Sequence, residues 1–391
     1  MDAQATAVFL RFFLDVKDPR RHNVRHVFTD ILTIAILAVL CKSDDWTEVV
    51  EWAKANRVWL KTFLALPKGI PGADTFRRVF ARIDPLGFEH CFVNWTRALA
   101  EVCAGGSSCA CDGRSIALDG KVLRRSFAHA WDRQAIHLVS AWCVQNQLVL
   151  GQLAVDSKSN EITALPALLD LLDLKGAVVT IDAMGCQREV AGRIVDKKGD
   201  YVLAVKGNQP TLHAKVKNLM DEAIIDGFKQ MRHDVFEQSE EGHGRIEKRT
   251  VWLTDEVSWL GEQMLGTWPG LASIAVVEST RQDLGDLTGK VTIERRWFIS
   301  SVKGCKPGDA RRMAQVIRGH WGVENQLHWR LDMSLGEDDS RLRVGHGAQN
   351  FSRLRRIVLN KLKSDKRKVS LKVKRYRCSI DREYLLERLR Q

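Results

Sequence analysis

The amino-acid sequence predicts a mixed α/β fold built on a central sheet and preceded by a helical domain. The chain has 391 residues, which is enough for two or three domains. Apolar residues recur at helical intervals through residues 1–103, and from Ile116 onward short β-branched runs alternate with helical segments. Hydrophobic residues make up 45% and charged residues 28%, as in ordinary soluble globular proteins.

Residues 1–103 form the predicted helical N-terminal domain. Pro67, Pro71 and Pro85 separate its periodic segments. The segment Cys103–Gly113 lacks periodicity and is the predicted linker. The expected helices are Ala7–Val16, Phe28–Leu40, Trp46–Leu64 and Phe88–Val102.

Residues 114–350 form the predicted α/β domain, in the order three strands, helix, strand, helix, strand. A strand-rich insertion occupies about 207–300, and the last long helix is expected over Asp309–Leu331. The expected strands are Ile116–Leu118, Ile136–Val144, Leu148–Val155, Val178–Ile181 and Tyr201–Val205, followed in the insertion by Glu247–Leu253, Ser273–Ser279 and Val291–Ser300.

Nearly all of the net charge of +12 lies at the C-terminus. Residues 351–391 contain 15 Lys plus Arg and 4 Asp plus Glu, which gives +11 and leaves a nearly neutral body. A basic tail of this kind indicates a polyanionic partner such as nucleic acid, although it can also be a solvated end.

The sequence contains neither a clear membrane-spanning segment nor a clear zinc-binding cysteine pattern. The apolar run Ile31–Cys41 is about half of a membrane span, and the acidic start at Asp2 does not match a signal peptide, so we expect a cytoplasmic protein. Cys103, Cys109 and Cys111 cluster without a fourth ligand at a zinc-site spacing. Free thiols are therefore favoured over zinc.

Two aspartates follow short apolar strands. Asp119 comes directly after Ile116–Leu118, and Asp182 directly after Val178–Ile181. If those strands are neighbours, their carboxylates converge at one edge of the sheet and can hold Mg²⁺, which prefers oxygen ligands. The alternative is that each Asp forms a turn or caps a helix.

A third acid lies in the helical block His320–Trp329. His320, Glu324 and His328 recur every four residues and share one helix face. This face could ligate zinc, or it could present Glu324 to metals held by the aspartates. Trp321 and Trp329 are interpreted as core anchors rather than base-stacking groups.

Five motifs in order resemble the DDE transposases of bacterial insertion sequences, in the branch that contains the H-repeat-associated proteins. The resemblance extends from Asp18-Pro19-Arg20 to Leu362 and covers nearly the whole chain. The motifs are Leu118-Asp119-Gly120-Lys121, Lys158-Ser159-Asn160-Glu161-Ile162, the Ile181–Gln187 block, Lys206-Gly207-Asn208-Gln209 and the His320–Trp329 block.

This resemblance implies a ribonuclease-H-like core with a β-rich insertion before the last catalytic helix. Asp119, Asp182 and Glu324 would be the catalytic acids and would hold two Mg²⁺ ions, which Mn²⁺ can replace. The spacings of 63 and 142 residues leave room for that insertion. The Tyr, Arg and Lys that related transposases carry around the Glu correspond here to Ile317, His320 and Leu331, so this part of the signature is absent.

The expected function is cleavage of transposon ends and their transfer to target DNA. A nucleoid-associated homodimer would assemble on double-stranded terminal repeats. The basic segment Arg353–Arg377, within the tail 351–391, and the N-terminal helices would bind DNA that flanks the cleavage site. Alternatives are a metal-dependent nuclease without strand transfer and an inactive DNA-binding relic. The expected DNA contacts are Lys121, Lys158, Lys206, His320, Arg353, Arg355 and Arg356.

Overall fold

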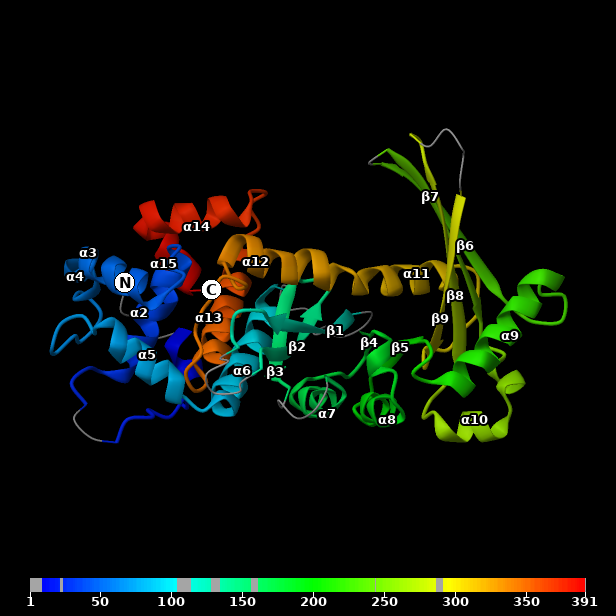
Figure 1. The fold of residues 1–391 in the computed structure, drawn as a ribbon, viewed down its shortest axis with the longest axis horizontal. Coiled ribbons are helices and arrows are strands. Elements are labelled where there is room, and N and C mark those ends of the chain that lie inside the picture. Colours follow the sequence, from blue (N-terminus) through cyan, green and yellow to red (C-terminus); the bar gives the residue numbers. More distant parts are fainter. Residues whose placement is uncertain are drawn as a thin grey trace. The chain divides into compact units, whose positions relative to one another are not determined.

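The computed structural model describes residues 9–21, 24–103, 114–127, 134–155, 161–242, 244–285 and 291–390. They divide into two compact units (Figure 1). The helical unit comprises residues 1–110, 120–160 and 324–391, and the sheet unit comprises 111–119 and 161–323. This division differs from the predicted boundaries, because the C-terminal segment belongs to the same unit as the N-terminal helices.

The helical unit surrounds one long helix, α13 (Gly347–Lys363), in which every residue from Gly347 to Leu362 is buried. It contacts helices from both ends of the chain and strand β3. The other elements are η1 (Arg11–Phe13), α2 (Phe28–Leu40), α3 (Trp46–Ala55), α4 (Arg57–Leu60), α5 (Ala73–Arg82), α6 (Pro85–Cys103), the hairpin β2 (Ile136–Cys143) and β3 (Leu148–Ala154), α12 (Trp329–Leu335), α14 (Leu371–Ile380) and α15 (Arg382–Arg390).

The sheet unit is built on strands that are parallel in one half and antiparallel in the other. Its strand order is β1-β4-β5-β9-β8-β7-β6, with β1, β4 and β5 parallel and the rest antiparallel. The strands are β1 (Arg114–Leu123, of which residues to Asp119 belong here), β4 (Ala177–Ile181), β5 (Asp200–Val205), β6 (Asp234–Gly242), β7 (Arg245–Thr254), β8 (Ser273–Asp283) and β9 (Val291–Ser300).

Helix α11 and several shorter helices accompany the strands of the sheet unit. Helix α11 (Asp309–His320) buries Ala310, Met313 and Ile317, spaced three and four residues apart, against Val178, Val251 and other strand residues. Figure 1 shows α11 running along the sheet. The remaining helices are α7 (Glu161–Leu171), η3 (Ala183–Gly185), α8 (Arg188–Asp196), α9 (Pro210–Asp226), η4 (Val257–Leu260) and α10 (Glu262–Thr267).

The predicted strands are present, and one further strand was missed. The three insertion strands correspond to β7, β8 and β9. Strand β6 has no alternating apolar pattern, since most of its side chains are exposed or half-buried at the end of the strand order. None of the helices in the described ranges is long and apolar enough to cross a bilayer.

The expectation that Arg353, Arg355 and Arg356 bind DNA is wrong. All three side chains are buried in α13. Arg353 Nε lies 2.7 Å from Glu89 Oε2, and Arg356 donates to Glu337 Oε1 at 2.8 Å. Arg355 donates to the carbonyl of Leu335 at 2.9 Å, and burial lowers its pKa to about 10. These guanidiniums neutralise buried carboxylates and cap carbonyls, which is why the segment is basic without being a free tail.

Replacing Arg353 by Met should destabilise the fold strongly. Both Arg353 and Glu89 are fully buried, so the variant leaves an uncompensated carboxylate, which typically costs about 3–5 kcal/mol. Urea unfolding followed by circular dichroism measures this loss.

The matched control is Arg377→Met. Arg377 pairs with Asp381, but both side chains are substantially exposed. Its removal should cost about 0–1 kcal/mol. Equal losses in the two variants would contradict the structural role of the Arg353 pair.

Candidate active site

The structure brings two of the predicted acids to neighbouring positions. Strands β1 and β4 are parallel and directly paired, with Leu118 opposite Ile181. Asp119 and Asp182 are the next residues of the two strands, and adjacent strands lie about 4.8 Å apart. Asp119 is half-buried and Asp182 exposed. The condition that the two strands are neighbours is met, but the expectation that Asp119 ends its strand is wrong, because β1 continues to Leu123. Asp182 does directly follow the last residue of β4.

Asp182 also shapes the turn that follows it. Its Oδ1 accepts a hydrogen bond from the Gly185 N–H at 3.3 Å and caps η3. Gly185 packs so closely against Ile181 and Leu165 that a Cβ there would overlap the Ile181 side chain. The turn-forming role considered for Asp182 is therefore real, and the second carboxylate oxygen is not needed for it.

His320 ties the end of α11 to β4. Its Nδ1 lies 3.0 Å from Thr180 Oγ1, two residues before Asp182. Burial lowers the pKa of His320, against the opposing effect of Asp182, so the ring is neutral near pH 7. A neutral imidazole can still donate one N–H, so the expected phosphate contact of His320 stays a prediction. Thr180, which positions this ring, had no distinguishing signal in the sequence.

Glu324 lies four residues beyond His320 and is exposed. It is in η5, a π-helical segment (Val323–His328), and belongs to the helical unit. Such segments recur at functional sites. Among the residues that the structure describes, no group of three or more His, Cys, Asp or Glu side chains gathers as a metal site. His328 is held neutral, because burial lowers its pKa to about 3.

The predicted lysines differ in their surroundings. Lys121 is 9% exposed and pairs with Asp332, with Glu337 at 3.8 Å and with Asp338 at 3.5 Å. These carboxylates already neutralise it, so the expectation of a phosphate contact is wrong for Lys121. Lys206 is exposed directly after β5. Lys158, like Cys109 and Cys111, lies outside the described residues.

The interpretation of Trp321 and Trp329 as core anchors is also wrong. Trp321 is 45% exposed and Trp329 49% exposed. An arginine lies over each ring instead, Arg296 at 4.5 Å from the Trp321 centroid and Arg330 at 4.6 Å from that of Trp329. Helical spacing of apolar residues cannot distinguish a buried tryptophan from one covered by a guanidinium.

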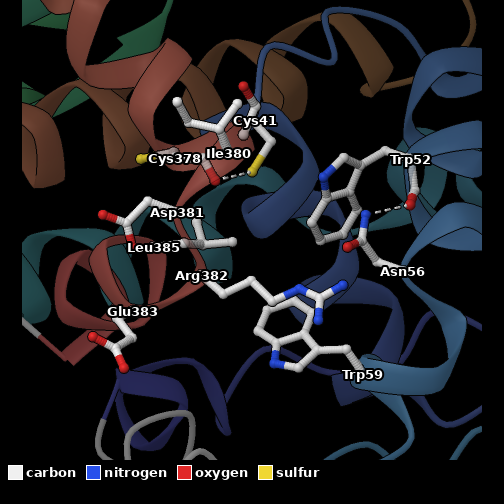
Figure 2. A pocket seen from close by; sticks show the side chains of 11 residues that line it. Cys41, Trp52, Asn56, Trp59, Cys378, Ile380, Asp381, Arg382, Glu383 and Leu385 are labelled. Carbon is white, nitrogen blue, oxygen red and sulfur yellow. Dashed lines mark hydrogen bonds between the residues drawn. The ribbon is translucent and has the colours of Figure 1, made fainter.

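A separate groove of about 570 Å³ lies in the helical unit (Figure 2). Trp52 and Trp59 line it, with the Arg382 guanidinium 5.6 Å from the Trp59 ring centroid. The Cys41 thiol donates to the Cys378 carbonyl at 3.2 Å. None of the predicted catalytic acids lines this groove.

Carboxylates at adjacent register positions of two parallel strands define a candidate site for metal-dependent chemistry on phosphates, and comparisons with known proteins identify the class. Residues 111–361 match the family described as Transposase DDE domain, and residues 10–96 match the one described as DDE_Tnp_1-associated. The chain therefore belongs to the DDE transposases of bacterial insertion sequences.

Full-length relatives agree. "Putative transposase YncI" of Escherichia coli O157:H7 is 37% identical over 99% of this chain and 95% of its own. "H repeat-associated putative transposase YhhI" of Escherichia coli K12 is 38% identical over 93% of this chain and 92% of its own. A cryo-EM structure of the piggyBac transposase synaptic complex with hairpin DNA covers 99% of this chain and 78% of its own, at a TM-score of 0.37 and 10% identity, a similarity that supports no inference.

Replacing Gly185 by Ala should disturb the turn after Asp182. The new Cβ would overlap Ile181, and overpacking of this kind costs about 1–3 kcal/mol. Thermal unfolding measures the loss. Gly266→Ala is the control, because space around Gly266 in α10 is open and Ala should there be neutral or stabilising. A Gly185→Ala variant as stable as wild type would refute the close packing.

Proposed function

We propose that this protein cleaves the ends of its insertion sequence and joins them to target DNA in a metal-dependent reaction. The observation that carries the proposal is the register pairing that places Asp119 beside Asp182. We further propose that the α/β part is a ribonuclease-H-like core, that Glu324 completes the acidic set, and that a homodimer assembles on DNA.

The donor set fits hard divalent cations. Asp119 and Asp182 offer carboxylate oxygens, which Mg²⁺ and Mn²⁺ prefer, and burial keeps the nearby His320 ring and Cys186 thiol in their uncharged forms by lowering the pKa of the first and raising that of the second. When bound, two such ions would activate the attacking oxygen and stabilise the leaving oxygen of a phosphoryl transfer.

The chain's own residues position the substrate. Asp182 sits exposed on a turn fixed by the Gly185 N–H, so its second oxygen is available to a divalent cation. Thr180 and His320 hold the end of α11, the helix that precedes Glu324 in the chain. Lys206 is an exposed cation directly after the next strand and is a candidate phosphate contact near the acids within the described residues. Accurate placement of this kind supplies much of the rate in phosphoryl transfer.

A DNA interface is proposed on the cations that the fold leaves exposed. The exposed cations around α14 and α15 replace Arg353, Arg355 and Arg356 in this proposal, because those three arginines are buried in α13. The exposed set is Lys366, Lys368, Lys372, Arg377, Arg382 and Arg390. Arg382 also lines the groove in Figure 2.

Asp119→Asn, Asp182→Asn and Glu324→Gln should each abolish Mg²⁺-dependent cleavage of a terminal-repeat duplex and leave its binding largely intact. Each change removes a negative ligand while keeping the side-chain shape. Gel analysis of end cleavage and of joined products, with filter binding in parallel, measures both properties. Asp170→Asn is the control, since Asp170 is an exposed partner of Arg193.

The outcomes separate the candidate functions. If the wild-type protein cleaves DNA but forms no joined product, the nuclease alternative is correct. If the wild-type protein binds DNA but does not cleave it, the protein is an inactive relic. Normal cleavage by any one acid variant would remove that residue from the site.

DNA affinity should fall steeply with salt. Six phosphate contacts predict a loss of about 10³-fold between 50 and 200 mM salt, because counterions are released on binding. Fluorescence anisotropy with a terminal-repeat duplex measures the slope. Lys368→Ala and Lys372→Ala should each reduce the slope by about 1, whereas Lys229→Ala, an exposed cation on the sheet unit, should not. If the salt dependence is unchanged in Lys368→Ala and Lys372→Ala, these lysines do not contact DNA and the proposed interface is wrong.

A further inference from the structure

The motif Lys206-Gly207-Asn208-Gln209 has a structural position that the proposed reaction does not yet use. It leaves the carboxyl end of β5, the strand that pairs in parallel with β4, with Leu203 opposite Ile181. The segments that follow the two strands therefore start side by side at the sheet edge that carries Asp182. This motif lies within the sheet unit, as does the turn after Asp182.

Two side-chain amides of the motif hold that turn. The Asn208 Nδ2 donates to the carbonyl of Ala183. The Gln209 Nε2 donates to the carbonyl of Cys186 at 3.0 Å and to Gln187 Oε1 at 3.3 Å. The two amides thus grip the backbone at the first residue of η3 and at the residue directly after it.

Backbone hydrogen bonds hold the motif that carries these two amides in place. The Gln209 N–H donates to the Lys206 carbonyl at 3.0 Å, and the Gln209 carbonyl accepts from His213 at 2.8 Å in the first turn of α9. Strand β5 on one side and the 17-residue helix α9 on the other therefore fix where the amides point. On the turn itself, Cys186 is buried and Gly185 is wedged against Ile181.

This arrangement controls the direction of the Asp182 carboxylate. Asp182 has only the Gly185 N–H as its bond to the turn, at a long 3.3 Å. If Ala183 or Cys186 shifted, the Gly185 N–H would move with them and the carboxylate would lose its orientation. Groups that orient a metal ligand typically change metal affinity or activity by about 10–100-fold when removed.

We infer that Asn208 and Gln209 are positioning residues, which hold the turn after Asp182 so that its carboxylate is ready to bind a divalent cation. This inference rests on the proposed metal-dependent function and extends it to a motif outside the acidic triad. A purely structural role for the two amides would affect stability alone.

The test is calorimetric titration of the full chain with Mn²⁺, without DNA, for Asn208→Ala, Gln209→Ala and Gln209→Met. Met keeps the length of Gln but lacks the donor. We expect a rise of about tenfold in the Mn²⁺ dissociation constant for each variant. The Mg²⁺ concentration for half-maximal end cleavage should rise in parallel, and excess Mn²⁺ should restore cleavage.

Thermal unfolding controls for general damage. Losing one such hydrogen bond should lower the melting temperature by only about 2–4 °C. Gln238→Ala is the matched control, because its amide donates to Glu240 at 3.1 Å on β6 and should leave Mn²⁺ binding unchanged.

Two failures are distinguishable. Folded variants that bind Mn²⁺ as wild type does would overturn the positioning role and leave the metal site intact. Wild type and Asp182→Asn with equal Mn²⁺ affinity would instead overturn the proposed metal site itself.

Discussion

The parallel pairing of β1 with β4 is the constraint on which the candidate site depends. Backbone hydrogen bonds fix Leu118 opposite Ile181, and this places two acids 63 residues apart in sequence at adjacent positions. A slip of one residue in this pairing would turn one carboxylate to the other face of the sheet. The His320–Thr180 contact and the amides after β5 all act on the strand end that this pairing defines.

The end of β4 was predictable because a short buried strand is apolar and stops abruptly at Asp182. The end of β1 was not, since the strand continues past Asp119 to Leu123, and its pairing with β4 is a tertiary contact that the sequence left as a condition. Strand β6 was not predictable, since an exposed strand needs no apolar alternation. The link from Asn208 to Ala183 was equally hidden, because a hydrogen bond across 25 residues leaves no periodicity.

Charge counting picked the wrong arginines at the C-terminus for a different reason. Composition records cations without their partners. The partner of Arg353 is Glu89, 264 residues away, and that of Arg356 is Glu337, which lies before α13. An amphipathic pattern with basic residues is typical of a solvated helix, and only tertiary structure reveals that α13 is buried and that its cations pair with carboxylates or donate to backbone carbonyls.

The enclosure of α13 also sets the order in which the chain can fold. The helices up to α6 are synthesised first, yet the helix that fills their centre begins 244 residues after α6 ends. At about 5–20 residues per second, that delay on the ribosome is roughly 12–50 s. The sheet unit lies almost wholly between them in the chain and can complete itself meanwhile. The apolar faces of the N-terminal helices stay uncovered until then, so the helical unit can finish folding only after α13 has been synthesised.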